Sequence, residues 1–423
     1  MKFEPKLYHL SNGIHVILDS MDVETVSIII RFNTGSRDET KTNNGITHFC
    51  EHMLLKGIPR LPSRTAIREF LENNGGVSNA STGGRLLQLE GRIIAENTEV
   101  LLELFADQLR ESLFDENKIE IERSVILDEL RRAQSSNVKK YNDLIHTNWF
   151  GFSVFRTLGT EENIKSFTRE QMLDWLKARL STKNCTICVS GKIDNPDYLV
   201  KKIEELFSFL PNHEVSQNTE FKYTSCDKFL KEPSVKNVWF DIVFPYLRLD
   251  TYENIRSNIA ESKFRRYLGQ ELSEVVRQKN GLVYGIGTSG YGNELTGVHG
   301  IHTETSPENL EKTIALIAQT AYRVYNTDKI TQPVIDRFLN IGKLADADFL
   351  ESASKRRDVL IGHFIDFGKL YDFNNMVEMN KSITADDAIE CSTGFFDGPM
   401  AIMSFGAEYG DLDLRKIWND NFK

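Results

Sequence analysis

The sequence contains an internal repeat, which restricts the chain to folds built from two similar units. In the first half, Gly75 precedes strand-like residues and a helix start at Leu101, and in the second half Gly281 stands in the same relation to Leu310. The corresponding positions lie 206 and 209 residues apart, and the strand-like segment 25–32 is echoed 212 residues later. A chain of 423 residues therefore predicts two homologous repeats of about 200 residues each.

Each repeat is predicted to be α+β, with a mostly antiparallel sheet packed against helices. Strands and helices come in runs instead of strict alternation, which is the pattern of that class. The polar stretch near the midpoint is the best linker candidate. We expect a first repeat at residues 1–212, a linker at 213–228 and a second repeat at 229–423.

Local signals predict the elements of the first repeat that matter most for chemistry. An apolar helix is expected over 46–56, ended by Gly57, and Ser63 is a suitable N-cap for a second helix. Two strands should follow at 77–82 and 86–94, and then a helical run from 97 to about 133, broken at Phe114-Asp115.

Charge and hydropathy exclude several classes of function. The chain has 61 acidic and 51 basic residues, a net charge of −10, and its sequence has no basic stripe, so we expect no nucleic-acid partner. No run of about 18 uncharged apolar residues occurs, and the first residues lack the apolar core of an export signal. The sequence thus predicts no membrane interaction and a cytoplasmic location.

The five cysteines are few and odd in number, which favours reduced thiols over a disulfide framework. Cys185 and Cys188 form a CxxC, a pattern that can bind zinc or carry redox chemistry. They fall on a predicted strand, where positions three apart point to opposite faces. We therefore interpret both as buried structural cysteines.

His48 and His52 form the pattern that carries chemistry. They lie four residues apart on the helix predicted at 46–56, so both rings project from one face, and Glu51 stands between them. This H-x-x-E-H sequence is the inverse of H-E-x-x-H and occurs in zinc proteases. A catalytic zinc takes three protein ligands and a water, so a third ligand must come from another segment.

The helix predicted at 115–133 offers that ligand. Glu122 and Glu129 lie seven residues apart, two turns, and therefore share a face. An isolated five-residue motif can arise by chance, and paired glutamates on a charged helix are usually only solvated. An apolar helix has no other reason to carry two histidines and a glutamate, so the setting favours a zinc site.

Taken together, these motifs resemble the pitrilysin/insulinase family of inverted-zincin metallopeptidases, over essentially the whole chain. In that family H-x-x-E-H is followed after 76 residues by a Glu, here Glu129, with a second functional Glu seven residues earlier, here Glu122. The segment 75–82, GGVSNAST, resembles the edge strand of the family. The segment 158–170 resembles processing-peptidase-type members, and 277–284, RQKNGLVY, resembles the motif R-x-K-x-G-L-x-Y.

The resemblance implies a zinc-dependent endopeptidase that hydrolyses peptides or unfolded segments. One zinc per chain, held by His48, His52 and Glu129, would lower the pKa of its water from about 15.7 toward 7, and Glu51 would be the general base. Glu122, grouped with the catalytic residues, would support ligand geometry or local charge.

The resemblance also assigns substrate contacts. Arg277 and Tyr284 would bind the substrate, as would Asn79 and Ala80 in the edge strand. This chain has Leu86-Leu87-Gln88 where relatives commonly carry aromatic residues, so a different side-chain preference is expected in the groove.

Family members enclose a chamber with four such repeats, and this chain supplies two. We therefore expect a homodimer in which Arg277 and Tyr284 of one subunit complete the zinc site of the other. A heterodimer with a zinc-less paralogue stays open. Two other functions also stay open, a non-catalytic or partner subunit of a processing peptidase and a maturation protease dedicated to one peptide.

Overall fold

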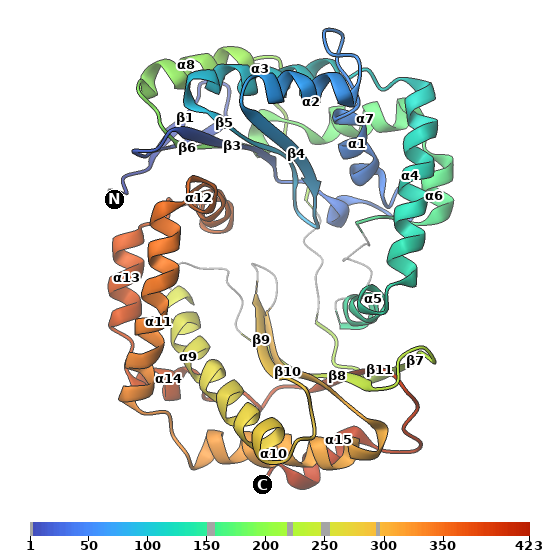
Figure 1. Ribbon diagram of the computed structural model, residues 1–423, viewed down its shortest axis with the longest axis vertical. Helices are drawn as coiled ribbons and strands as arrows, with labels where there is room; N and C mark the ends of the chain where they lie inside the picture. Colours follow the sequence, from blue (N-terminus) through green and yellow to red (C-terminus); the bar gives the residue numbers. More distant parts are fainter. Residues whose placement is uncertain (1–2, 150–156, 218–222, 247–253, 293–296) are drawn as a thin grey trace. The chain divides into compact units, whose positions relative to one another are not determined.

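The computed structural model forms two compact units, each of which takes in segments from both halves of the chain (Figure 1). It describes all residues except 1–2, 150–156, 218–222, 247–253 and 293–296. The first unit comprises Met1–Gln134, Ser153–Thr219 and Ala345–Tyr371, and the second comprises Ser135–Phe152, Glu220–Leu344 and Asp372–Lys423.

A six-stranded sheet forms the centre of the first unit, in the order β1-β2-β6-β3-β5-β4. Its strands are β1 (Lys6–His9), β2 (His15–Ser20), β3 (Thr25–Phe32), β4 (Gly76–Thr82), β5 (Leu87–Ile94) and β6 (Cys185–Gly191). Only β2 and β6 run parallel among these pairs. The turn at Asn12-Gly13 joins β1 to β2 as a hairpin, because this dipeptide tolerates the left-handed backbone that a tight turn needs.

Helices cover one face of this sheet and form the larger core with it. They are α1 (Ile46–Leu54), α2 (Arg64–Asn73), α3 (Thr98–Glu111), α4 (Glu116–Ser135), α6 (Glu161–Ser166), α7 (Arg169–Arg179) and α8 (Pro196–Leu206). The Ser63 side chain accepts a hydrogen bond from the Ala66 amide and caps α2 as expected. The break between α3 and α4 includes Phe114 at φ +44°, a left-handed backbone that a helix cannot continue through.

One helix from the far half of the chain, α12 (Ala353–Phe367), covers the opposite face of the same sheet (Figure 1). Its Leu360 and Ile361 pack against Ile29 and Cys188. Arg356 of α12 is fully buried and pairs with Asp19 of β2, so the buried cation has its counter-charge. Cys185 instead belongs to the core on the helix-covered face, so the two cysteines lie on opposite faces as the strand pattern predicts.

The second unit has a five-stranded sheet in the order β7-β11-β8-β10-β9, which repeats the arrangement of β2-β6-β3-β5-β4 without a counterpart of β1. The strands are β7 (Lys228–Lys231), β8 (Val238–Tyr246), β9 (Ile286–Gly292), β10 (Gly297–Thr305) and β11 (Ala401–Gly406), and only β7 and β11 pair in parallel. Its helices are α5 (Asn137–Trp149), α9 (Asn254–Leu272), α10 (Leu310–Asn326), α11 (Gln332–Glu351), which ends beyond the unit boundary, α13 (Phe373–Lys381), α14 (Ala385–Cys391) and α15 (Leu414–Asn421).

The helix α5 covers the second face of the sheet in the second unit, as α12 does in the first. It comes from the first half of the chain but packs on β11, where the ring of Tyr141 lies against Trp239 and Phe405. The Tyr141 hydroxyl donates a hydrogen bond to Asp241. Each sheet is thus covered on its second face by a helix from the other half of the sequence.

The predicted α+β fold with two similar units is confirmed. The predicted boundaries at 212 and 229 separate two repeats of the sequence, whereas the two units are separated by their compactness, so these boundaries stay a prediction. Part of the proposed linker lies outside the described residues. All five cysteines are free. Among the described residues, no helix combines the length and apolar content that crossing a bilayer requires.

Candidate metal centre

The short helix α1 is fixed at its N-terminus by a buried carboxylate. Glu39 accepts hydrogen bonds from the Asn44 side chain at 2.8 Å and from the backbone amides of Gly45 at 2.8 Å and Thr47 at 2.9 Å. A negative group at a helix N-terminus satisfies amides that have no partner within the helix. At the other side of the helix, Phe49 and Cys50 are fully buried in the core. The helix therefore has one possible rotation, which turns His48 and His52 away from that core.

Three side chains from α1 and α4 converge at one point. The Nε2 atoms of His48 and His52 each lie 3.8 Å from Oε2 of Glu129, and one donor atom from each of the three residues lies within 4.8 Å of the others. His48 is buried, whereas the Glu129 side chain is 35 % exposed.

Two imidazoles and one carboxylate with an open side match a catalytic zinc site, which keeps one position for water. The donor atoms lie slightly wider apart than around a bound ion, so a small inward movement would let them bind zinc. The structure brings the three predicted ligands together, and their function as ligands stays a prediction.

Glu122 supports His52 from behind. Its Oε2 lies 3.0 Å from Nδ1 of His52, and its Oε1 pairs with the ammonium of Lys56. With the proton on Nδ1, His52 donates to Glu122 and directs the lone pair of Nε2 toward Glu129, the arrangement usual for metal-binding histidines. Burial alone would raise the pKa of the Glu122 carboxyl, but the hydrogen bonds from His52 and Lys56 outweigh it and lower that pKa.

Glu51 lies beside the ligands and is oriented from the sheet. The hydroxyl of Thr82, the last residue of β4, donates a 2.6 Å hydrogen bond to Oε2 of Glu51. Burial raises the pKa of the Glu51 carboxyl, while the Thr82 hydroxyl and the neighbouring His52 act in the opposite direction. A carboxylate with a raised pKa is a better proton acceptor than an exposed one, which suits a general base.

The predicted substrate residues fall in two places. Asn79 is exposed on β4, whereas Ala80 is 3 % exposed with its methyl group in the core, so only its backbone can reach a ligand. Arg277 and Tyr284 belong to the second unit, where the guanidinium carbon of Arg277 lies 5.8 Å from the centre of the Tyr284 ring. The Tyr284 side chain is 86 % exposed. The structure leaves the substrate roles of all four residues untested.

Sequence reasoning missed three residues that shape this centre, namely Glu39, Lys56 and Thr82. Lys56 had a usable signal, because the spacing of four residues that links His48 to His52 continues to position 56. Thr82 and Glu39 had none, since their partners are set by the pairing of β4 with the sheet and by a loop conformation.

The sequence matches two models of one protein family. The family model described as insulinase (peptidase family M16) matches residues 15–160, and the model described as peptidase M16 inactive domain matches residues 166–340. The first match contains His48, Glu51, His52, Glu122 and Glu129.

Individual relatives agree with the family match. A protein named uncharacterized zinc protease from Rickettsia felis is 27% identical over 98% of this chain and 100% of its own length. The mitochondrial-processing peptidase subunit beta of Dictyostelium discoideum is 33% identical, over 51% of this chain and 46% of that protein. A crystal structure of a protease from Helicobacter pylori superposes with a TM-score of 0.82 at 18% identity, covering 96% of this chain and 100% of that one, which shows a shared fold.

Proposed function

The chain belongs to peptidase family M16, and from this premise we propose that it is a zinc-dependent endopeptidase that hydrolyses peptides or unfolded segments. The observation that carries the proposal is the convergence of His48, His52 and Glu129 beside a buried, hydrogen-bonded Glu51. Relatives named zinc proteases support zinc as the metal.

The contacts in the centre support a separate catalytic role for each residue. His48, His52 and Glu129 would hold a zinc ion, which would supply Lewis acidity that favours ionisation of water and stabilises negative charge on the peptide carbonyl oxygen. Glu51 accepts the proton of the attacking water and then delivers it to the nitrogen of the leaving amine. Thr82 keeps the Glu51 carboxylate directed at that water, and Glu122 holds the His52 ring through Nδ1.

We further propose that Arg277 and Tyr284 bind the substrate carbonyl or the oxyanion, with Asn79 and the backbone of Ala80 contacting the peptide. The support is the motif at 277–284 and the exposure of Tyr284 beside a guanidinium. A peptide lying along β4 would be held by backbone hydrogen bonds, which favours broad sequence specificity.

The proposed working assembly is a homodimer in which Arg277 and Tyr284 of one subunit serve the zinc site of the other. A heterodimer with a zinc-less paralogue is the second candidate, because one relative is named as a beta subunit. Mixing Glu51→Gln with Arg277→Ala subunits should restore hydrolysis that neither variant shows alone. A monomeric mass in solution with full activity would contradict both assemblies.

The decisive experiment compares wild type with Glu51→Gln on a quenched peptide, alongside metal analysis. We expect both proteins to bind zinc, and we expect Glu51→Gln to lose roughly 10²- to 10⁴-fold in kcat/KM, because general-base catalysis is removed. Glu111→Gln, at an exposed position of α3, is the matched control and should retain activity.

Two outcomes would redirect the proposal. Less than about half a zinc per chain without peptidase activity would favour an inert or partner subunit, because a catalytic site of this kind needs its metal. Hydrolysis of a single peptide from a broad library would instead favour a dedicated maturation protease.

A further inference from the structure

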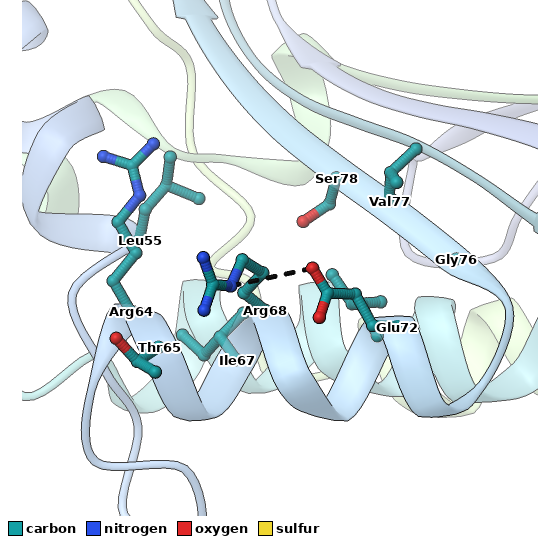
Figure 2. Close-up of a pocket in the computed structure, with 10 residues that line it drawn as sticks. Leu55, Arg64, Thr65, Ile67, Arg68, Glu72, Gly76, Val77 and Ser78 are labelled. Carbon is teal, nitrogen blue, oxygen red and sulfur yellow. Dashed lines mark ion pairs between the residues drawn. The ribbon is translucent and has the colours of Figure 1, made fainter.

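A cavity of about 400 Å³ lies between α2 and the beginning of β4, entirely within the first unit. Its floor is apolar and consists of Leu55, Ile67 and Leu71. Its polar wall is formed by Arg64, Arg68 and Glu72 of α2. Figure 2 shows Arg68 and Glu72 between the helix and the strand that carries Val77 and Ser78, and Arg64 beside Leu55 at the start of the helix.

Two elements lead from the lining of this cavity to the metal centre. Leu55 is the C-cap residue of α1, three positions after His52. Ser78 lies on β4 four residues before Thr82, whose hydroxyl contacts Glu51. At about 3.3 Å per residue, four strand residues span roughly 13 Å. A peptide lying along β4 therefore reaches the cavity within a few residues of its reacting bond.

The strand β4 can accept such a peptide because it is the edge of its sheet. Among the described residues it pairs only with β5. Side chains of a strand alternate between two faces, so Ser78, Ala80 and Thr82 share the face that carries the helices. Every second side chain of an added strand would lie on that face, and one of these would lie over the cavity while another lies near Glu51.

The charges of the cavity wall determine what side chain it suits. Arg64 forms no ion pair with any described residue, and Arg68 lies 3.6 Å from Glu72. That pair is weak, because the two side chains are 65 % and 60 % exposed. The wall thus has a net positive charge with guanidinium groups above an apolar floor. A guanidinium binds a carboxylate through two parallel hydrogen bonds.

We propose that this cavity selects an acidic side chain of the peptide substrate, with Arg64 as the main determinant and Arg68 as its support. The proposal rests on the proposed peptidase function and names a specificity of that same site. The apolar floor accommodates the methylene groups, which favours glutamate over aspartate.

The test uses quenched peptides that differ only by Glu, Gln or Lys, placed in turn at each position within four residues of the cleaved bond. For wild type we expect kcat/KM at one position to be about tenfold higher for Glu than for Gln, and lower still for Lys. Arg64→Gln should bring the ratio of kcat/KM for the Glu and Gln peptides close to one. Arg64→Glu should give a higher kcat/KM for the Lys peptide than for the Glu peptide. Arg92→Gln, an exposed substitution on β5 outside the cavity, should keep the wild-type ratio.

Binding of the same peptides to Glu51→Gln, followed by fluorescence anisotropy, separates the two hypotheses. A Glu preference in binding without any hydrolysis by wild type would support the cavity and contradict the peptidase function. Equal binding and equal hydrolysis of Glu and Gln peptides at every position would overturn the acidic preference while the peptidase stands. A preference that Arg64→Gln and Arg64→Glu leave unchanged would overturn the role of Arg64.

Discussion

In both units a helix carries a glutamate that lies close to a histidine. The two arrangements differ in how far the side chains are exposed to solvent and in whether their polar atoms already have partners within the protein. In the first unit, His48 and His52 direct Nε2 atoms toward Glu129, whose side chain is one third exposed. In the second unit, Glu261 of α9 and His299 of β10 are each 1 % exposed, with His299 Nδ1 3.9 Å from the carboxylate.

In the second unit, Glu261 and the other face and nitrogen of His299 already have partners within the protein. Nε2 of His299 donates a 2.7 Å hydrogen bond to the Phe395 carbonyl, and the ring stacks on that of Phe395. Arg265 pairs with Glu261 at 3.2 Å. Burial lowers the pKa of His299 to about 3 and raises that of Glu261 to about 7. Similar residue types on similar sheets thus give a chemical centre only where donor atoms converge at an accessible point.

The largest expected effect comes from removing a ligand of the open centre. Glu129→Gln should lose bound zinc and lower kcat/KM by roughly a thousandfold or more, because several kcal/mol of charge stabilisation disappear with the metal. Metal analysis and peptide hydrolysis provide the measurements. Asp128→Asn changes the neighbouring exposed residue and should behave as wild type. A fully active, zinc-loaded Glu129→Gln protein would remove the basis of the comparison.

A smaller loss of zinc affinity is expected when the substituted residue, Glu122, contacts a ligand and not the metal itself. Glu122→Gln leaves the three ligands in place but loses the charged partner of His52 and Lys56, so zinc affinity should fall about 10- to 100-fold. Competition with a chelator measures this affinity. Glu120→Gln on the exposed side of the same helix is the control. Unchanged affinity would show that Glu122 only fills space.

The smallest effect on activity is expected for the buried pair Glu261 and His299 of the second unit. A substitution there is expected to change the free energy of unfolding instead. The folded-state pKa of Glu261 is about 7 against an ordinary value of 4.5, so the folded protein binds the extra proton and loses stability as pH rises through this window. Relative to wild type, the free energy of unfolding of Glu261→Gln should therefore increase between pH 4.5 and 7, by up to about 3 kcal/mol.

Urea unfolding at several pH values, with peptidase activity measured in parallel, tests that expectation. His299 titrates in both proteins and cancels from the difference. Glu311→Gln, at an exposed site of α10, is the matched control and should retain the stability and activity of wild type. A loss of hydrolysis in Glu261→Gln at pH 7 would mean that the second unit is not chemically silent.

Most elements around the centre could be predicted because their signals are local. Ser63 marks a helix start because its side chain can accept a hydrogen bond from an amide three residues later, and this bond from Ala66 is present in the structure. The four-residue and seven-residue spacings of the histidines and glutamates likewise follow from the helix period, so the faces of α1 and α4 could be assigned in advance.

The helices on the second face of each sheet could not be predicted in the same way. The apolar stripe of α12 fits any flat apolar surface, and nothing within 353–367 specifies the sheet of the first unit. Its place follows from contacts more than 300 residues away in sequence, such as that between Arg357 and the Ser27 hydroxyl. The same holds for α5 and the sheet of the second unit.

The sequence by itself determined the two-unit α+β fold, the helix faces and the identity of the metal-binding candidates, because these depend on residue type and short-range periodicity. The tertiary structure alone decided which side chains support them. Thr82 reaches Glu51 only after β4 has paired with β5, and Glu122 reaches Lys56 only after α4 has packed beside α1. Local periodicity sets direction along one element, whereas distances between elements come from packing the whole unit.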